Sequence, residues 1–541
     1  MQPGRAKDAK IEVLERRVLA VLLISLSLYG QTGVLTANYD NNRTSANLNE
    51  PYLWVGNVSP DTFGKLGTFP VSGQVYAQPL FAGDLNVPAC GVCDVLFVAT
   101  MTNNVYAFNA NAPDQTEPLW TINLGTPVPS SSLGLRSAIS PSVGILGTPV
   151  IDLGRNAIYL IAEILQAGKP VFQLHALDLS TGQDVPNSPV TIAAAVNGSG
   201  DASVNGRIAL DSQRHLQRPG LLASNGRVYA AFGSVYDRAP YHGWVLGFDT
   251  GDLSLTAVFN TTPDGAAGGI WQSGRGLIAD PDGSLYLGTG NGVYDGVTNF
   301  GESFLKLTPN LLVSDWFVPA DWQSMSDVDL DTASLGPMLI PSLDMLLAGD
   351  KASNAYLIDR WNMGHMWFGN SAIPQVRQVV SQGGLFNSAV WDRSDGPIAY
   401  FVDQGAFTMA YRITDRQIEA YPFSWTEVTS DYPWQGMAIS AYGDLDETGI
   451  LWMTAGDHKQ SDAPGTLLAY NAQDLTQLLW SSDMVPDRDQ MGGFAKFATP
   501  TVANGMVFVP TLTNQVAVYG LLPLDTPERR TRTKVLPNRS K

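Results

Sequence analysis

The sequence predicts an all-β fold, an eight-bladed β-propeller built of four-stranded antiparallel blades. Three observations carry this prediction. Short runs rich in Val, Phe and Tyr alternate with turns that contain Gly and Asn. These runs group into similar units that recur roughly every 30–70 residues, as propeller blades do. The last unit offers only three strands, so another segment must pair with its open edge.

The missing strand is expected close to the N-terminus. The segment Lys65–Val71 lies just before the first unit and reads as a strand, whereas the regular pattern stops after Leu522. We therefore expect residues 65–71 to pair with residues 516–519 and to close the ring. Seven blades remain an alternative if the weak sixth unit is an insertion, and a β-sandwich would leave the repetition unexplained.

Each unit in turn shows short apolar strands bounded by turn residues. The last one, for example, turns at Asn504-Gly505 between two Val-rich runs. In chain order the expected units span residues 75–123, 147–182, 218–259, 276–317, 338–359, 388–413, 438–480 and 499–522.

Composition and the two termini complete the expected organisation. We assign residues 1–36 to a signal peptide or short anchor, 37–64 to an arm lying on the ring, 65–522 to one propeller domain and 523–541 to a disordered basic tail. The first assignment rests on basic residues before the apolar run Val18–Leu28, which is too short to span a membrane. It predicts a secreted or periplasmic protein. A net charge of −18 argues against nucleic acid as a partner.

Cys90 and Cys93 are the only cysteines of the chain and occur as Cys-Gly-Val-Cys. A redox motif would precede a helix, yet the strand-like run Val95–Thr100 follows. A haem-attachment motif would need His where Asp94 stands, and a zinc site would need further ligands. A small loop disulfide is the favoured interpretation for an exported protein.

A pattern of Ala-x-Asp/Asn, a turn and then Trp recurs across the units, for instance at Ala107-Phe108-Asn109 with Trp120 and at Ala469-Tyr470-Asn471 with Trp480. It resembles the tryptophan-docking repeat of the quinoprotein alcohol dehydrogenase superfamily, in particular an uncharacterised exported branch of it. The resemblance covers about Lys65 to Leu522. It implies an eight-bladed propeller and, as cofactors, pyrroloquinoline quinone (PQQ) and Ca²⁺.

Two segments are similar to the cofactor site of that family. The run Leu285–Asn291 ends in Gly-Thr-Gly-Asn, and the resemblance implies that Asn291 ligates calcium and lies at the cofactor. The run Gly349–Arg360 resembles the family's segment whose basic residue touches the quinone, and Lys351 takes that place. A cation there would stabilise negative charge on the quinone. The alternatives are a plain turn for Asn291 and a surface lysine for Lys351.

An acidic run, Asp327-Val328-Asp329-Leu330-Asp331, lies between these segments, where the family carries its general base. On a strand, all three carboxylates would share one face and could hold a metal or raise a pKa. Asp329 is the first candidate for the base and Asp327 the second. The family's His and Trp are absent from this run, and a solvated acidic loop is the alternative.

Two further residues follow from the same resemblance. Trp271 lies near the position of the family's cofactor-stacking tryptophan, and Asp237 lies near a calcium-binding acid, usually Glu in the family. The adjacent cysteine pair that caps the quinone in many members is absent.

Two functions from different classes are therefore expected. In one, an alcohol or sugar hydroxyl is oxidised with PQQ and Ca²⁺, Asp329 taking the proton and Lys351 assisting hydride transfer. In the other, the propeller is a non-catalytic extracytoplasmic scaffold that binds a protein or glycan through loops such as 127–143 and 195–217.

Overall fold

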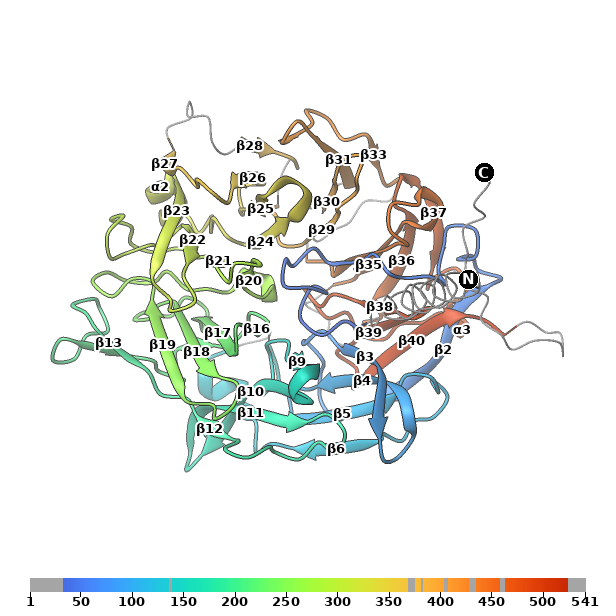
Figure 1. Cartoon of the computed structure of the whole chain (residues 1–541), viewed down its shortest axis with the longest axis horizontal. Helices are drawn as coiled ribbons and strands as arrows, with labels where there is room; N and C mark the ends of the chain where they lie inside the picture. The colour runs from blue at the N-terminus through green and yellow to red at the C-terminus, as the bar shows by residue number, and fades with distance from the viewer. Residues whose placement is uncertain are drawn as a thin grey trace, which may run out of the picture. The chain divides into compact units, whose positions relative to one another are not determined.

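A computed structural model describes residues 33–523 except 136–138, 368–374, 381–382, 403–406, 428–433 and 458–462. Residues 1–32 of the expected signal or anchor (1–36) and residues 524–541 of the expected tail (523–541) lie outside the described residues. The part of the chain from Gly33 on forms one compact unit. In it, eight small sheets surround one axis (Figure 1). The predicted eight-bladed all-β propeller is confirmed.

The blades follow one another in chain order, and the first strand of each lies nearest the axis (Figure 1). The first four blades are β3–β6 (Leu80–Val87, Gly91–Ala99, Asn104–Asn109, Trp120–Asn123), β9–β12 (Val150–Asp152, Ala157–Gln166, Lys169–Asp178, Val190–Thr191), β16–β19 (Leu222–Ser224, Arg227–Ser234, Trp244–Asp249, Leu255–Asn260) and β20–β23 (Ile278–Ala279, Leu285–Gly288, Phe304–Leu307, Val313–Pro319).

The remaining blades complete the ring. They are β24, β25, β26 and β28 (Leu335–Ile340, Met345–Gly349, Asn354–Asp359, Gln375–Gln378), β29, β30, β31 and β33 (Ser388–Trp391, Ile398–Val402, Thr408–Thr414, Ser424–Trp425), β34–β37 (Met437–Ser440, Ile450–Ala455, Thr466–Asn471, Asp474–Ser481) and β38–β40 (Thr501–Ala503, Met506–Pro510, Gln515–Leu521) joined by β2 (Phe63–Pro70). Short helices occur between strands, among them α2 (Trp322–Asp327) and α3 (Pro486–Asp489).

The ring closes as the sequence predicts. Strand β2 pairs antiparallel with β40, and the register joins Lys65 to Tyr519 and Pro70 to Gln515. Two distant parts of the chain thus complete one sheet and remove the open edge of the last blade. The innermost strand of the first blade starts later than expected, at Leu80 instead of Val75. Pro79 precedes that strand, and a proline has no N–H with which to extend the ladder.

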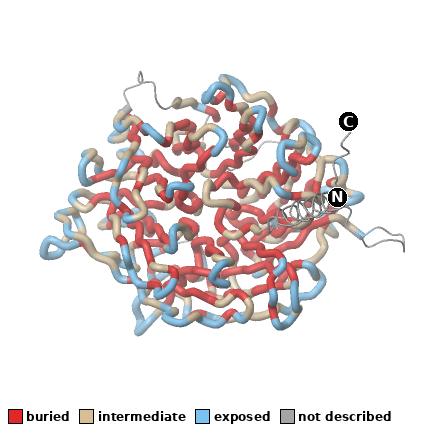
Figure 2. The backbone as a smooth tube through the Cα atoms, in the orientation of Figure 1, coloured by how far each residue is buried: buried red, intermediate tan, exposed pale blue. Residues whose placement is uncertain are grey.

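Aromatic side chains join consecutive blades. Trp120 donates its indole N–H to the carbonyl of Leu179 in the next blade, at 2.9 Å, and its ring covers Gly182, where a side chain would collide with it. The fully buried Trp480 packs against Phe63 and Tyr519 of the last blade. These contacts confirm the predicted docking of aromatic residues between blades. Figure 2 shows buried backbone through the blades and exposed backbone at the outer turns.

The expected N-terminal arm follows the inner edge of the ring. Its first residues, from Gly33 to Glu50, contact the innermost strand or the inner loops of every blade in turn. The contacts run from Val34 with Phe81, Leu35 with Ile151, Thr36 with Leu221, Asn41 with Ala279, Asn42 with Leu339, Thr44 with Val390 and Ser45 with Ile439 to Glu50 with Gly505. The arm therefore satisfies main-chain groups that the innermost strands would otherwise leave unpaired.

One smaller expectation is also confirmed. Cys90 and Cys93 form a disulfide across the turn between β3 and β4, as the sequence favours. Among the described residues, no helix is both long and apolar enough to cross a membrane.

Candidate functional site

A polar cluster gathers at one end of the fourth and fifth blades, on the loops that follow β21 and β25. Its members are Trp271, Asn291, Asp329, Asp331 and Lys351, which approach one another from four separate loops. Glycine allows the approach, because a Cβ on Gly290 would lie 2.3 Å from Asp331 Oδ1. The structure thus unites four of the six residues predicted for the site.

Lys351 is the centre of the cluster. Its Nζ lies 2.5 Å from Asp331 Oδ2 and 2.7 Å from Asp329 Oδ1, so one ammonium bridges two carboxylates. Asn291 ties the same acids together, since its backbone N–H donates to Asp331 Oδ1 at 2.9 Å and its side-chain amide donates to Asp329 Oδ1 at 2.8 Å. Lys351 and Asn291 thus each hold both Asp329 and Asp331 in position.

The two carboxylates differ in their exposure to solvent. The Asp331 side chain is 7% exposed, whereas that of Asp329 is 63% exposed. Burial raises the pKa of Asp331, although Lys351 and the Asn291 amide oppose the rise. Burial also lowers the pKa of Lys351, but the two acids outweigh this effect and leave the pKa above its ordinary value. The ammonium is therefore retained at neutral pH.

The run from Asp327 to Asp331 does not form a strand, so its three carboxylates do not share the one face that a strand would have given them. The helix α2 ends at Asp327, and the chain then loops so that only Asp331 is buried. Asp327 accepts a hydrogen bond from Gln323 on the exposed side of the helix. Asp331 was part of the predicted run but was not chosen, because alternation along a strand cannot distinguish one acid of a loop from the next.

Asp237, predicted as a metal ligand, lies on the loop after β17. Its carboxylate accepts hydrogen bonds from the hydroxyls of Ser234 at 2.7 Å and Tyr241 at 2.9 Å. Its charge raises the pKa of the Tyr241 hydroxyl after the larger effect of burial, and Asp331 and Asp329 add to the rise. Tyr241 thus lies between Asp237 and the cluster, and the structure does not join Asp237 to Asn291.

Glu302 is a buried carboxyl beside the cluster that the sequence analysis did not select. Its Oε2 accepts the N–H of Thr332 at 2.6 Å, while its Oε1 has no hydrogen-bond partner. Burial and the charge of Asp331 raise the pKa of Glu302 to about 8. A single Glu in the run Gly301-Glu302-Ser303 carries no spacing signal in the sequence.

Whether a hard cation suits these residues can be judged from the unpaired oxygens. Oδ1 of Asn291 and Oε1 of Glu302 are both buried without a hydrogen-bond partner, and amide and carboxylate oxygens are ligands that Ca²⁺ prefers. Within the described ranges, no group of three or more His, Cys, Asp or Glu residues is arranged to hold a metal. A cation here would depend on the Asn291 amide, and the donor set fits it.

Trp271 provides a flat wall next to the cluster. Lys351 Nζ lies 5.5 Å from the ring centroid, and the rings of Phe386 and Phe497 lie 6.1 and 6.2 Å from it. A cavity on the axis behind this wall measures about 20 Å³, which is room for about one water. A tricyclic quinone does not fit that cavity.

Residues with positive φ occur in many parts of the chain, and some of them lie at or near the cluster. Asp329, Glu302, Gln272 and Phe497 all have positive φ, at 62°, 50°, 45° and 65°. Residues other than glycine rarely adopt this conformation, and it occurs preferentially at functional sites.

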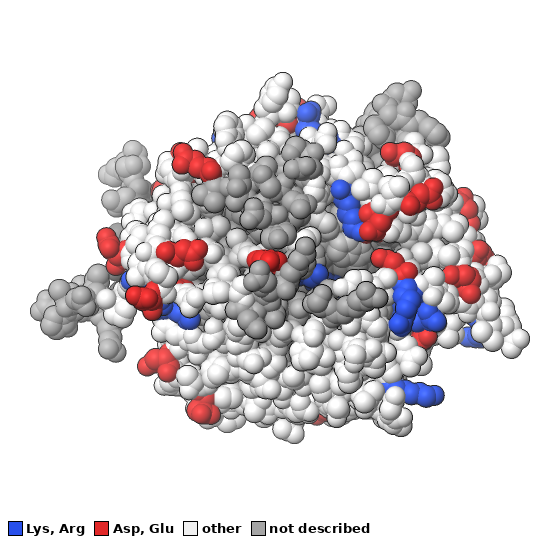
Figure 3. Space-filling view, turned by 180° about the vertical axis from the view of Figure 1, so that it is seen from behind, with Lys and Arg blue, Asp and Glu red and all other residues white. Residues whose placement is uncertain are grey.

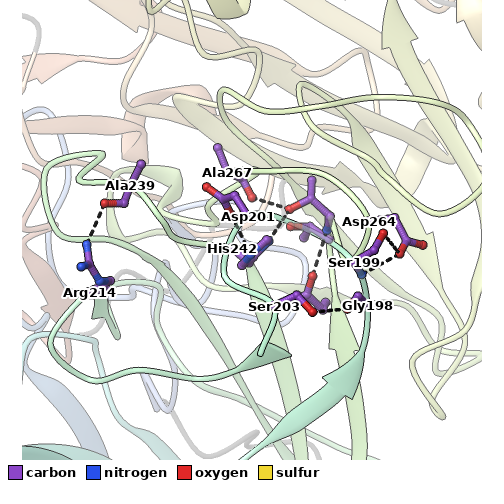
Figure 4. A network of polar contacts seen from close by, with 12 residues as sticks. Gly198, Ser199, Asp201, Ser203, Arg214, Ala239, His242, Asp264 and Ala267 are labelled. Carbon is purple, nitrogen blue, oxygen red and sulfur yellow. Dashed lines mark hydrogen bonds and ion pairs between the residues drawn. The ribbon is translucent and has the colours of Figure 1, made fainter. Parts of the chain in front are cut away.

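A second polar network adjoins the cluster (Figure 4). The buried side chain of His242 lies between two partners. Its Nε2 is 3.2 Å from Asp201 Oδ1, and its Nδ1 is 2.9 Å from Thr262 Oγ1. The contact with Asp201 has the distance of an ion pair but not the alignment of a hydrogen bond. Because Ala267 bridges to Gly292, this network braces the loop beside Asn291.

Glu163 in β10 is another buried acid that the sequence analysis missed. Neither of its carboxyl oxygens has a hydrogen-bond partner, and burial raises its pKa well above the ordinary value. The only signal in the sequence was a single acid within the apolar run Ala157–Leu165.

Comparison with known proteins supports the fold. No protein-family model and no curated protein matches the chain. A europium-containing methanol dehydrogenase aligns with a TM-score of 0.60 at 12% identity, covering 91% of this chain and 98% of that one. A quinohemoprotein alcohol dehydrogenase, ADHIIG from Pseudomonas putida HK5, aligns at 0.56 and 12%, covering 92% and 82%. The predicted resemblance to quinoprotein alcohol dehydrogenases is thus confirmed at the level of the fold.

Proposed function

We propose that this propeller is an exported oxidoreductase that removes hydrogen from an alcohol or sugar hydroxyl, with PQQ and Ca²⁺ as cofactors. The observation that carries the proposal is the bridging of Asp331 and Asp329 by Lys351 beside the ring of Trp271. The structural neighbours that are named as alcohol and methanol dehydrogenases support the same reaction class.

The residues of this chain have separate tasks in the proposal. Asn291 and Glu302 would hold the cation through their unpaired oxygens, with Asp331 as an additional oxygen ligand. Asp329, which is exposed and hydrogen-bonded to Lys351, would accept the hydroxyl proton of the substrate. Lys351 would then offset the negative charge that develops next to Trp271. The bound quinone would accept the hydride.

A calorimetric titration tests the proposal. Wild type and Asn291→Ala are titrated with CaCl₂ and then with PQQ in the presence of Ca²⁺. Saturable, calcium-dependent PQQ binding that the variant loses supports the assignment. Equal binding by both proteins, or none by the wild type at millimolar Ca²⁺, contradicts it. Asp327→Asn is a matched control, because Asp327 lies outside the cluster.

The second candidate function is a scaffold without catalytic activity. The small axial cavity favours it, since about 20 Å³ leaves no room for a ligand in that cavity. The loops around the His242 network would then carry the contact with a protein or glycan. Pull-down with variants of the 195–217 loop would detect such a partner, and PQQ-dependent dye reduction by the wild type would argue against this function.

A further inference from the structure

Cations surround the axis of a chain that is strongly acidic overall. Acidic side chains are scattered over the face seen in Figure 3. Near the axis, in contrast, Arg43 and Arg275 are buried, and Arg218 and Lys496 are partly buried. Asp40 is the acid whose charge acts on the first two. Such a concentration of positive charge has to be neutralised or used.

The guanidinium groups of Arg43 and Arg275 are hydrogen-bonded within the fold. Arg43 donates to the carbonyl oxygens of Leu277 and Ala37, both at 2.7 Å. Arg275 donates to the carbonyl oxygen of Ser388 at 2.8 Å and to Asn387 Oδ1 at 2.9 Å. These two guanidinium groups connect the arm to the innermost strands and are structural.

Arg218 and Lys496 are different. Among the described residues, neither side chain has a hydrogen bond or an ion pair with an acid. Both lie against one aromatic ring instead, Arg218 at 5.3 Å and Lys496 at 5.6 Å from the centroid of Phe497. Burial, followed by the charge of Arg218, lowers the pKa of Lys496 to about 8. Two cations whose charges act on each other thus lie against one ring, and neither is paired with an acid in the part of the chain that the structure describes.

Phe497 is held in a conformation that the fold must enforce. Its φ of 65° is unusual for a bulky residue, and its N–H donates to the carbonyl of Trp434 at 2.9 Å. The same ring lines the axial cavity together with Arg218, Asn387 and Thr499. The cavity has room for about one water, so a ligand could lie only at its mouth.

We propose that Arg218 and Lys496 form a carboxylate-binding site at the mouth of the axial cavity. The carboxylate would lie between the guanidinium and the ammonium, and a flat or apolar body would cover Phe497 and extend toward Trp271. Charge-assisted hydrogen bonds to the two cations would replace their mutual repulsion with attraction. Because Phe497 lies 6.2 Å from Trp271, the site adjoins the polar cluster without sharing a residue with it. If the proposed oxidation is correct, the carboxylate site would favour hydroxy acids as substrates. This substrate class rests on the proposed function.

Titration calorimetry with sodium benzoate tests the site on the full chain without added metal. Arg218→Gln and Lys496→Gln are each expected to weaken binding about tenfold or more, which is the loss of one charge-assisted hydrogen bond. Lys169→Gln, at an exposed lysine of the β10–β11 hairpin, is the matched control and should bind as the wild type does. Melting temperatures confirm that all variants fold.

The outcomes separate this site from the proposed metal site. Asn291→Ala should keep full affinity for benzoate even if it loses calcium, so failure of one proposal leaves the other standing. Competition with PQQ, itself a carboxylate, assigns the site to the cofactor if PQQ displaces benzoate and to the substrate if both bind together. Absence of benzoate binding up to millimolar concentration, or equal binding by the wild type, Arg218→Gln and Lys496→Gln, overturns the inference.

Discussion

Lys351 forms two ion pairs of nearly equal length, and burial should make them unequal in energy. Its Nζ lies 2.5 Å from Asp331 and 2.7 Å from Asp329, but the Asp331 side chain is 7% exposed and that of Asp329 is 63% exposed. Separating a buried pair costs about 3–5 kcal/mol, whereas an exposed pair contributes about 0–1 kcal/mol. We predict a coupling energy of roughly 3 kcal/mol with Asp331 and under about 1 kcal/mol with Asp329.

Two double-mutant cycles measure these energies. Lys351→Met is combined with Asp331→Asn in one cycle and with Asp329→Asn in the other, and urea unfolding is followed by tryptophan fluorescence at pH 7. Because the pKa of Lys351 is raised in the folded state, its contribution is fully present below its ordinary pKa and is lost only as the pH rises above it. Salt should weaken the Asp329 coupling alone. A coupling with Asp329 that equals or exceeds that with Asp331 would refute the reasoning.

Four other outcomes are expected. Replacing Cys90 and Cys93 by Ser should lower the free energy of unfolding by at most about 2 kcal/mol in chemical denaturation, because the disulfide closes a very short loop. Trp480→Ala should cost about 3–5 kcal/mol in the same assay, since the ring is fully buried between two blades; a cost under about 1 kcal/mol would show that it does not join them. Burial raises the pKa of Glu163 in the folded protein. The stability that depends on a protonated Glu163 is therefore fully present below the ordinary pKa of the group and is lost as the pH rises through its folded-state pKa. Glu163→Gln should therefore raise the melting temperature at pH 7 but not at pH 4, and identical pH profiles would contradict this. Benzoate affinity should fall as the pH rises through the Lys496 pKa of about 8, next to the permanently charged Arg218, and should stay level in Lys496→Arg.

The fold could be predicted almost completely because its signals are local and repeated. Short Val-rich strands, turns such as Asn504-Gly505 and a missing fourth strand were enough to pair residues 65–71 with the last blade. The path of the arm was less accessible. A polar segment such as Asn41-Asn42-Arg43 looks solvated in sequence, yet Arg43 is fully buried because main-chain carbonyls surround it.

The candidate site could be predicted only in part. The family resemblance placed Asn291 and Lys351 at the site, and in the structure both donate a hydrogen bond to Asp329. The choice among the neighbouring acids could not be predicted, because it depends on which carboxylate the loop after α2 turns inward. Glu302 and Glu163 were missed for a related reason, since a buried acid with an unpaired oxygen looks the same in sequence as any exposed one.

The arm also constrains when the protein can become complete during synthesis. Residues near Tyr39 leave the ribosome early, yet the hydroxyl of Tyr39 bonds the carbonyl of Pro500, which is made 461 residues later. The strands of each earlier blade are complete before then, but the arm can make all its contacts only when the final sheet exists. Translation that stops before the eighth blade should therefore release a chain whose leading end stays accessible to proteases, which gives a simple way to detect unfinished rings.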